Sequence, residues 1–391
     1  MHGFNYVPQS AQALWHIACA LYTDNVNKMK IAQVAPLYES VPPRLYGGTE
    51  RVVHYLTEEL VKLGHEVTLF ASEDSITSAS LIPICKEALR LNLNCEDSLA
   101  PHILEIQEVI ERAQQFDIIH FHIDYLHFPF SSHLSTPHLT TLHGKLSIPE
   151  LQMIYNKFNL PVVSISSSQR APLPQANFVA TIHHGLPEEL HCSGSGTGGY
   201  LAFLGRISPE KGIDKAIEWA ITANTPLKIA AKVDKADEKY FQNEIRHLLA
   251  HPLIEYIGEI NEKEKTSFLG NARALLFPIN WQEPFGMVLI EALACGTPVI
   301  AHPFGSVPEI ITHGENGFLV NSTKEATAAI HKLSNWNRLL ARQSFDKRFT
   351  AYRMALDYLR VYEKLIAIHQ AEKKNYHSLV TINYPLLKIS S

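Results

Sequence analysis

The sequence predicts an α/β protein of two domains, each built on an open, doubly wound sheet of parallel strands. Short apolar runs of the kind that form buried strands alternate with segments of helical periodicity along most of the chain. A glycine-rich stretch near residue 195 divides this series into two parts of similar size. The length of 391 residues also agrees better with two domains than with one.

The first half begins with an apolar run at 29–35, which predicts a buried strand. A helix is predicted from Thr49, because apolar residues then recur at spacings of three and four, and Gly64 ends it. Residues 67–71 predict a second strand, so these elements form a strand–helix–strand unit with parallel strands. Further strands of this half are predicted at 117–122, 138–142 and 161–165.

The second half repeats this pattern, and an amphipathic segment at 352–368 predicts a long helix. Its strands are predicted at 200–204, 227–231, 254–257, 274–278 and 297–301. The expected organisation is an N-terminal extension at 1–28, a first domain at 29–195, a second domain at 196–350, a C-terminal helix at 351–372 and a tail at 373–391. The extension shows no clear periodicity, and Met29 is an alternative start.

Composition excludes several classes of protein. The formal net charge of −5 argues against a nucleic-acid-binding protein, which usually carries a basic surplus. The chain has no run of about 18 apolar residues, so no transmembrane segment is predicted. Its cysteines are scattered without a Cys-x-x-Cys pair, which favours a reducing, cytoplasmic setting over a disulfide framework or a zinc site.

Three glycines, Gly194, Gly196 and Gly199, match the letters of a dinucleotide-binding motif. That motif must follow a strand and open a helix, whereas these glycines precede the strand at 200–204. We therefore interpret them as part of a linker.

The segment 281–300 has the most specific pattern in the chain. Glu283 follows a predicted strand, and 286–294 has the pattern of a short helix. A helix N-terminus offers unpaired N–H groups and a partial positive charge, which suit phosphate or hydroxyl oxygens. Glu283 beside it can accept hydrogen bonds from sugar hydroxyls. Glu291 lies among apolar residues and needs a partner, such as a ribose diol. The alternative is that both glutamates solvate a surface helix.

Cations follow the first strand of the second half. Arg206 and Lys211 lie near its carboxyl end, where open α/β sheets bind ligands, and two cations there can neutralise a diphosphate. A pair of solvated surface charges is the alternative. In the first half, Gly47 and Gly48 join the first strand to its helix, where the backbone can approach an anion closely.

Polar side chains also end two strands of the first half. His143 follows the strand at 138–142 and is either a ligand contact or a satisfied core histidine. His120, His122 and Asp124 lie on one side of the strand at 117–122, because side chains alternate with a period of two. One of these three is a candidate contact for a second substrate.

The Glu-x7-Glu spacing of Glu283 and Glu291, within Glu-Pro-Phe-Gly…Glu-Ala…Gly-Thr-Pro-Val, resembles the donor-site motif of the family 4 retaining glycosyltransferases. The resemblance covers most of the chain from Met29 to about Ile368. It implies the GT-B fold, in which two Rossmann-like domains face each other across a cleft. It also implies that the C-terminal helix crosses back onto the first domain.

The resemblance assigns roles to the motif residues. Glu283 would bind hydroxyls of the donor sugar, and Glu291 the ribose hydroxyls. The expected catalytic residues are Arg206, Lys211, Glu283 and His143. The expected donor-binding residues are Gly47, Gly48, Arg206, Lys211, Glu283, Phe285, Gly286, Met287, Val288 and Glu291. His122 and Asp124 are the acceptor-side candidates, and the segments 36–46 and 72–115 are expected to shape the acceptor pocket.

The implied reaction moves a sugar from a UDP- or GDP-linked donor to a sugar, lipid-linked or small-molecule acceptor, with retention of configuration. No metal is expected, because the chain lacks the Asp-x-Asp triplet with which the other glycosyltransferase class holds a divalent ion. An epimerase or phosphorylase of the same fold and a non-catalytic nucleotide-sugar-binding protein are the alternatives. One departure from the family is Gly305-Ser306, where relatives often have two glycines.

Overall fold

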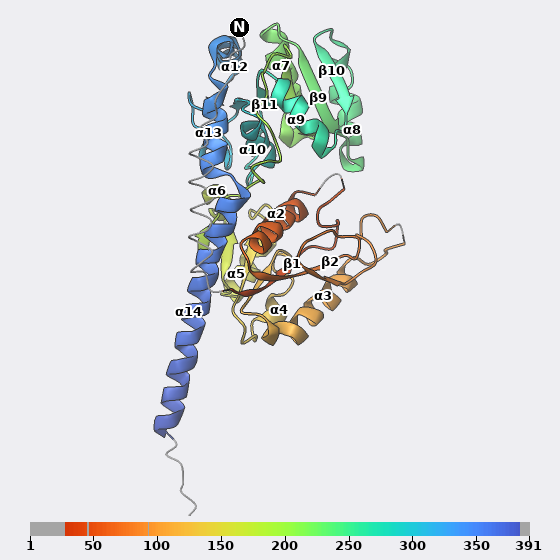
Figure 1. Ribbon diagram of the computed structural model, residues 1–391. Coiled ribbons are helices and arrows are strands. Elements are labelled where there is room, and N and C mark those ends of the chain that lie inside the picture. Colours follow the sequence, from red (N-terminus) through yellow and green to blue (C-terminus); the bar gives the residue numbers. More distant parts are fainter. Residues whose placement is uncertain (1–27, 45–46, 93, 384–391) are drawn as a thin grey trace, which may run out of the picture.

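The computed structural model describes residues 28–44, 47–92 and 94–383. It contains two parallel sheets, one in each half of the chain, which lie one above the other along the molecule (Figure 1). Residues 1–27 of the predicted extension and residues 384–391 of the predicted tail lie outside the described residues. Among the residues described, no helix is both long and apolar enough to span a membrane.

The first half forms a seven-stranded sheet with the order β3-β2-β1-β4-β5-β6-β7, in which all neighbours are parallel. The strands are β1 (Lys30–Val34), β2 (Glu66–Ala71), β3 (Ser80–Pro83), β4 (Ile118–Phe121), β5 (His138–Leu142), β6 (Val162–Ser164) and β7 (Phe178–Thr181). The five strands predicted from the sequence are confirmed. The edge strands β3 and β7 were not predicted, because their side chains are only partly buried and form no continuous apolar run.

The second half forms a six-stranded sheet with the order β10-β9-β8-β11-β12-β13, again with all neighbours parallel. The strands are β8 (Leu201–Arg206), β9 (Leu227–Lys232), β10 (Ile254–Gly258), β11 (Leu275–Phe277), β12 (Val299–Ala301) and β13 (Gly317–Leu319). Five of the six were predicted, and the missed strand, β13, has only three residues. Both sheets therefore have the doubly wound order of a dinucleotide-binding fold.

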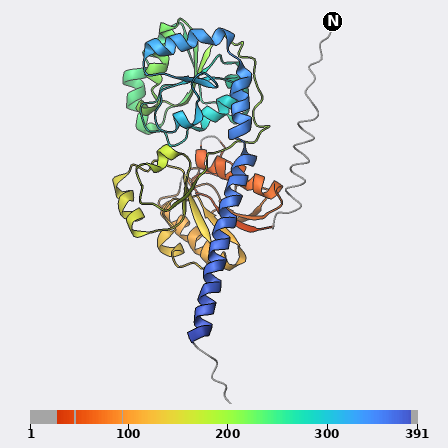
Figure 2. The same ribbon diagram turned by 90° about the vertical axis from the view of Figure 1, so that its left-hand side faces the viewer.

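Helices cover both faces of each sheet (Figure 2). On β8, Leu201 and Phe203 join one apolar core, whereas Ala202 joins another on the opposite face. The helices of the first half are α2 (Gly48–Lys62), α3 (Leu99–Arg112), α4 (Phe128–Ser131), α5 (Pro149–Lys157) and α6 (Ser167–Arg170). Those of the second half are α7 (Ile213–Thr222), α8 (Glu238–Tyr240), α9 (Glu262–Asn271), α10 (Met287–Ala294), α11 (Val307–Ile310), α12 (Thr323–Lys332) and α13 (Arg338–Arg348).

The last helix, α14 (Ala351–Asn383), runs back along the first half and contacts α2 (Figures 1 and 2). It is longer than predicted. Tyr358 and Tyr362 of α14 are fully buried against the first sheet. The Tyr362 hydroxyl lies 2.7 Å from His120 Nδ1 and accepts a hydrogen bond from Gln33 Nε2 at 3.2 Å, and the Tyr358 hydroxyl lies 2.8 Å from Thr141 Oγ1. The helix therefore completes the core of the first half.

A carboxyl group of the first half is buried without a hydrogen-bond partner among the described residues. Glu105 of α3 is completely buried, and neither of its carboxyl oxygens has a hydrogen-bond partner among the described residues. Burial raises the pKa of Glu105 well above its usual value, because the ionised form would lose its hydration. An unpaired buried carboxyl destabilises the fold.

We therefore expect Glu105→Leu to raise the free energy of unfolding at pH 7 by about 1–3 kcal/mol, measured by urea denaturation. The difference in the free energy of unfolding between Glu105→Leu and the wild type should increase with pH. Because the folded-state pKa is raised, the wild-type protein loses stability as pH rises from the unfolded pKa of ~4.3 toward the folded one. Glu111→Leu, on the exposed face of the same helix, is the control and should change stability by less than about 0.5 kcal/mol. An equal gain at pH 4 and pH 8 would contradict this account.

Candidate active site

A cleft of about 690 Å³ lies between the carboxyl ends of the two sheets. Its wall on the first half consists of the start of α2 and the turns 122–126 and 143–145, which follow β4 and β5. Its wall on the second half includes the end of β8, Lys211, Trp281 and residues 283–288 around the start of α10. The four residues predicted to be catalytic, Arg206, Lys211, Glu283 and His143, all line this cleft.

A smaller pocket of about 190 Å³ adjoins the cleft. The residues that line both include Gly47, Gly48, Arg206, Met287 and Val288. Glu291 lines only the smaller pocket, whereas Lys211 and Glu283 line only the larger cleft. The residues predicted to bind a donor are therefore divided between two connected cavities.

The N-terminus of α10 opens onto both cavities. Gly286 precedes the helix with φ of 82°, a left-handed conformation that favours glycine. No side chain caps the helix, so its first N–H groups have no side-chain partner. Phe285, Met287 and Val288 line the cleft beside them. This end of the helix carries a partial positive charge and suits an anionic ligand.

Glu283 and Lys211 form an ion pair close to the N-terminus of α10. Lys211 Nζ lies 2.5 Å from Glu283 Oε2, and Glu283 is buried. The ammonium group also lies 5.0 Å from the centre of the Trp281 ring. The main chain of Glu283 is held as well, because its carbonyl accepts the N–H of Ser306 at 2.9 Å. The pair thus presents one carboxylate and one cation to the cleft in a fixed arrangement.

Glu291 has the partner that its buried position requires. Lys265 Nζ lies 2.8 Å from Glu291 Oε1 and 3.2 Å from Glu262 Oε2. Arg51, from α2 of the first half, forms an ion pair with the same Glu262. His191, Glu262 and Glu291 offer atoms within 4.8 Å of one another, a spacing that suits a metal. Because Lys265 and Arg51 already neutralise both carboxylates, we interpret the cluster as an ion-pair network.

Arg206 is surrounded by three acidic side chains. Its guanidinium lies 2.9 Å from Glu210, 3.4 Å from Asp234 and 3.6 Å from Asp237. It lines both cavities, directly at the end of β8. The carboxylates hold it at the junction of the cleft and the smaller pocket.

The Gly47–Gly48 turn faces Arg206 from the first half. A Cβ on Gly47 would lie 2.7 Å from Pro43 Cβ, so only glycine fits there. Glu50, in the first turn of α2, is buried and also lines the cleft. Burial raises the pKa of Glu50 to about 7. Glu50 was not predicted as a site residue, because in the sequence it is an ordinary charge in the first turn of a helix.

A chain of hydrogen bonds connects His143 to buried residues of the first half. His143 Nε2 lies 2.9 Å from His122 Nδ1, and His122 Nε2 lies 2.8 Å from Gln33 Oε1. The His143 ring stacks on that of His184, with 5.3 Å between the ring centres. Burial lowers the pKa of His143 to about 3 and that of His122 well below its usual value, so both rings are neutral. His120 does not line the cleft and bonds to α14 instead.

Asp124 lies just beyond β4 with φ of 51°, a strained conformation for a residue other than glycine. It lines the cleft together with His143. Although the residue as a whole is exposed, desolvation of its carboxylate in the cleft raises the pKa of Asp124 to about 6. Strain held at a ligand-facing residue is typical of a functional position.

Several residues of the site carry no signal in the sequence. Arg51 and Lys265 are ordinary charges on helical patterns, and only the apolar neighbours of Glu291 indicate that a cation must lie near it. Tyr38, Arg90 and His102 line the cleft from segments that were expected to shape the acceptor side.

The Gly305-Ser306 pair supports the loop that carries Glu283. Gly305 has φ of 62°, and a Cβ there would lie 2.3 Å from the Glu283 nitrogen. The hydroxyl of Ser306 donates a hydrogen bond to the Phe285 carbonyl at 2.8 Å. The serine hydroxyl therefore adds a contact to this loop.

Comparisons with known proteins agree with this geometry. Residues 194–350 match the family described as Glycosyl transferases group 1, and residues 46–172 match Glycosyltransferase Family 4. Two uncharacterized glycosyltransferases of Methanocaldococcus jannaschii are similar. One is 27% identical over 67% of this chain and 79% of its own length, and the other is 25% identical over 79% and 90%.

Solved structures share the fold. AviGT4, a glycosyltransferase involved in avilamycin A biosynthesis, has a TM-score of 0.68 at 23% identity and covers 87% of this chain and 98% of its own. HepE of Anabaena, in complex with UDP and glucose, has a TM-score of 0.65 at 17% identity and covers 86% and 100%. The two-domain GT-B fold expected from the sequence is thereby confirmed.

We expect Gly305→Ala to displace the Glu283 loop and to weaken binding of a nucleotide sugar about tenfold, since positions in a binding site are sensitive to shifts of ~1 Å. Gly314→Ala is the matched control. Gly314 also has a positive φ, of 84°, but a Cβ there meets nothing within 4 Å. Both variants share the backbone strain, about 1 kcal/mol, and only the first has the clash. Titration calorimetry and melting temperatures measure the difference, and equal effects in both variants would contradict this role of the loop.

Proposed function

Since this chain belongs to the group 1, family 4 glycosyltransferases and depends on a nucleotide-sugar donor, we propose that it transfers the sugar with retention of configuration and without a bound metal ion. One observation carries the proposal. A single interdomain cleft presents Arg206, Lys211, Glu283 and the N-terminus of α10 on one wall, and the Gly47 turn and His143 on the other.

The donor spans both cavities in this proposal. The nucleoside occupies the smaller pocket, where Glu291 accepts hydrogen bonds from the ribose hydroxyls. The diphosphate lies at the N-terminus of α10, between Arg206 and Lys211. The sugar lies in the cleft, with its hydroxyls at Glu283 and its ring beside His143. We propose a UDP- or GDP-linked donor, and the UDP held by HepE supports the first of these.

The acceptor hydroxyl approaches from the first half. Asp124 presents a carboxylate to the cleft, and we assign it the contact with the acceptor. Both ring nitrogens of His122 are bonded, to Gln33 and His143, so we assign His122 the support of His143. The acceptor is a sugar, a lipid-linked or a small-molecule hydroxyl, and Tyr38 contributes an aromatic wall beside it.

The chemistry follows from these positions. The bond between the anomeric carbon and the diphosphate oxygen breaks, and the acceptor oxygen forms its bond to the same face of that carbon. The acceptor proton passes to the departing phosphate, so no enzymic base is required, and no enzymic nucleophile is required because the acceptor oxygen attacks the anomeric carbon directly. Arg206, Lys211 and the N–H groups of α10 stabilise the charge that develops on the diphosphate.

These cations take the place that a divalent ion has in other glycosyltransferases, which supports a metal-independent reaction. A reducing, cytoplasmic setting agrees with the four cysteines of the described residues, which are all free thiols. Because the family matches are to transferases, the epimerase, phosphorylase and binding-protein alternatives have no observation that favours them.

Lys211→Ala and Glu291→Ala should have different kinetic effects. Lys211→Ala removes a cation that acts on the leaving group, so kcat should fall about 100–1,000-fold at saturating donor. Glu291→Ala removes charged hydrogen bonds to the ribose, so the donor KM should rise about 10–100-fold. Transfer from a panel of nucleotide sugars, with EDTA present, measures both.

Lys215→Ala is the control for the loss of a positive charge. Lys215 is exposed on α7, and among the described residues its ion-pair partner is Glu218. It should retain wild-type rates. Undiminished turnover of Lys211→Ala at saturating donor would overturn the assignment of Lys211, and loss of transfer in EDTA would overturn the metal-free reaction.

The fall of the transfer rate on the acidic side of its pH profile should reflect protonation of Asp124. We expect transfer to fall as pH decreases through about 6, because protonation removes the charge of the carboxylate and makes it a weaker hydrogen-bond acceptor for the acceptor hydroxyl. Asp124→Asn should remove this limb and lower kcat/KM for the acceptor about 100-fold, while donor hydrolysis without acceptor persists. Glu50 also titrates in the cleft, near 7, so Glu50→Gln is measured in parallel. A limb near 6 that survives in Asp124→Asn would refute the assignment.

A further inference from the structure

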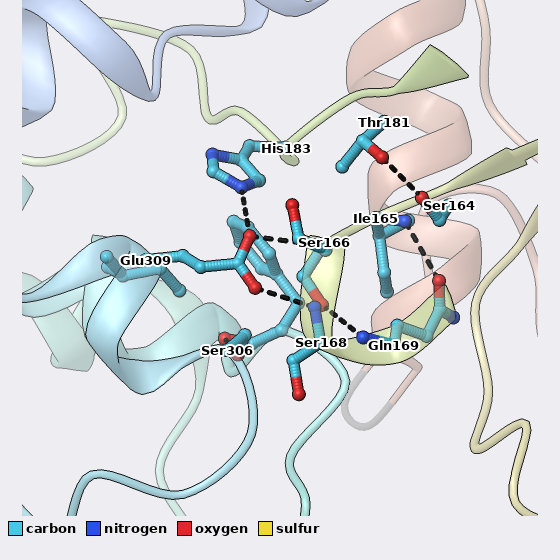
Figure 3. Close-up of polar contacts among 12 residues, drawn as sticks. Ser164, Ile165, Ser166, Ser168, Gln169, Thr181, His183, Ser306 and Glu309 are labelled. Carbon is cyan, nitrogen blue, oxygen red and sulfur yellow. Dashed lines mark hydrogen bonds and ion pairs between the residues drawn. The ribbon is translucent and has the colours of Figure 1, made fainter. Parts of the chain in front are cut away.

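A short turn of the first half connects the two halves beside the cleft. The turn consists of Ser166 and α6, and Ser166 Oγ caps α6 by accepting the N–H of Gln169 at 2.9 Å. Glu309 of α11 reaches this turn from the second half. Its two oxygens accept the N–H groups of Ser167 and Ser168, each at 2.8 Å. Figure 3 shows the carboxylate facing the start of α6.

The same turn holds the donor loop of the second half. The hydroxyl of Ser166 donates a hydrogen bond to the Pro284 carbonyl at 2.7 Å. Pro284 lies between Glu283, whose side chain pairs with Lys211, and Phe285, whose carbonyl is bonded to Ser306. A residue of the first half therefore fixes the main chain of a loop that belongs to the donor site.

The turn also holds the loop of His143 in the first half. Gln169 Nε2 donates to the Leu142 carbonyl at 2.7 Å and to the Gly144 carbonyl at 2.8 Å. Its Oε1 accepts the N–H of Ile165 at 2.9 Å. A shift of α6 would therefore move the residues on both sides of His143. Glu309 is the residue of the second half whose carboxylate accepts the N–H groups at the start of α6.

We propose that Glu309 is a positioning residue for transfer: by binding α6 across the interface, it sets the closed arrangement in which the Glu283 loop and the His143 loop face each other. This rests on the proposed function, because it takes the donor sugar to lie at Glu283. Both N–H groups that its side chain binds, and the His183 ring at 3.2 Å, belong to the first half.

The ionised form of Glu309 matches these partners. Burial opposes its ionisation, but the hydrogen bonds from His183 and from the Ser167 and Ser168 N–H groups outweigh burial and lower the pKa of Glu309. A glutamine here would keep one accepting oxygen and turn an NH₂ group toward an N–H donor. One interdomain bond would then become a repulsive contact, while the apolar cores of both halves would remain intact.

Glu309→Gln is the test, with Glu325→Gln as its matched control. Glu325 is exposed on α12 and accepts a backbone N–H, that of Asn321, within the second half only. We expect Glu309→Gln to lower kcat about 10–100-fold, because misplacement by ~1 Å can cost that much. The Kd of the nucleoside diphosphate UDP, whose contacts lie in the second half, should stay within about twofold. Glu325→Gln should match the wild type in both.

A second readout does not depend on activity. Small-angle scattering of the unliganded proteins should give a larger radius of gyration for Glu309→Gln than for the wild type and Glu325→Gln. Ser166→Ala loses the bond to Pro284 and the cap on the Gln169 N–H but keeps both bonds from α6 to Glu309, so it should lower kcat without this expansion. Wild-type kcat and wild-type scattering in Glu309→Gln would overturn the inference. If the wild type transferred no sugar from any donor yet Glu309→Gln expanded, the proposed function would fail and the closing role of Glu309 would stand.

Discussion

The requirement that buried carboxylates be paired with cations determines the arrangement of the whole site. Glu283 is paired with Lys211 in the cleft, and Glu291 with Lys265 in the adjoining pocket. Leaving either carboxylate buried and alone would cost several kcal/mol, so Glu283 and Glu291 each require a basic side chain beside them. The result is a wall that is nearly neutral without ligand.

The two halves meet through polar contacts at the cleft, although an apolar cluster that includes Leu186, Leu289 and Met354 also joins them away from it. Arg51 pairs with Glu262 beside the smaller pocket, and Glu309 binds the start of α6 beside the larger cleft. Interfaces of this polar kind permit the domain motions that substrate binding and product release require. Residues of both halves therefore complete the site only when the halves are together.

Most of the fold could be predicted from the sequence, because parallel strands buried on both faces leave continuous apolar runs. The missed strands β3, β7 and β13 are short or only partly buried, so their runs do not stand out. The donor wall was also predictable, since Glu283, Glu291 and the start of α10 lie close together in the sequence. Lys265 and Glu309 were not, because their partners lie far away along the chain, and only the folded backbone brings these charges to them.

The attachment of α14 to the first sheet limits how such enzymes can exchange parts during evolution. Tyr362 satisfies Gln33 and His120, and Tyr358 satisfies Thr141, so the first half buries polar groups whose partners are encoded about 200–330 positions later. A gene recombination that replaced everything after the linker would import a foreign helix into this polar core. Under the proposed function, in which the second half binds the donor, a new donor specificity would therefore enter more safely as an inserted segment, from β8 to α13, than as a replaced C-terminus.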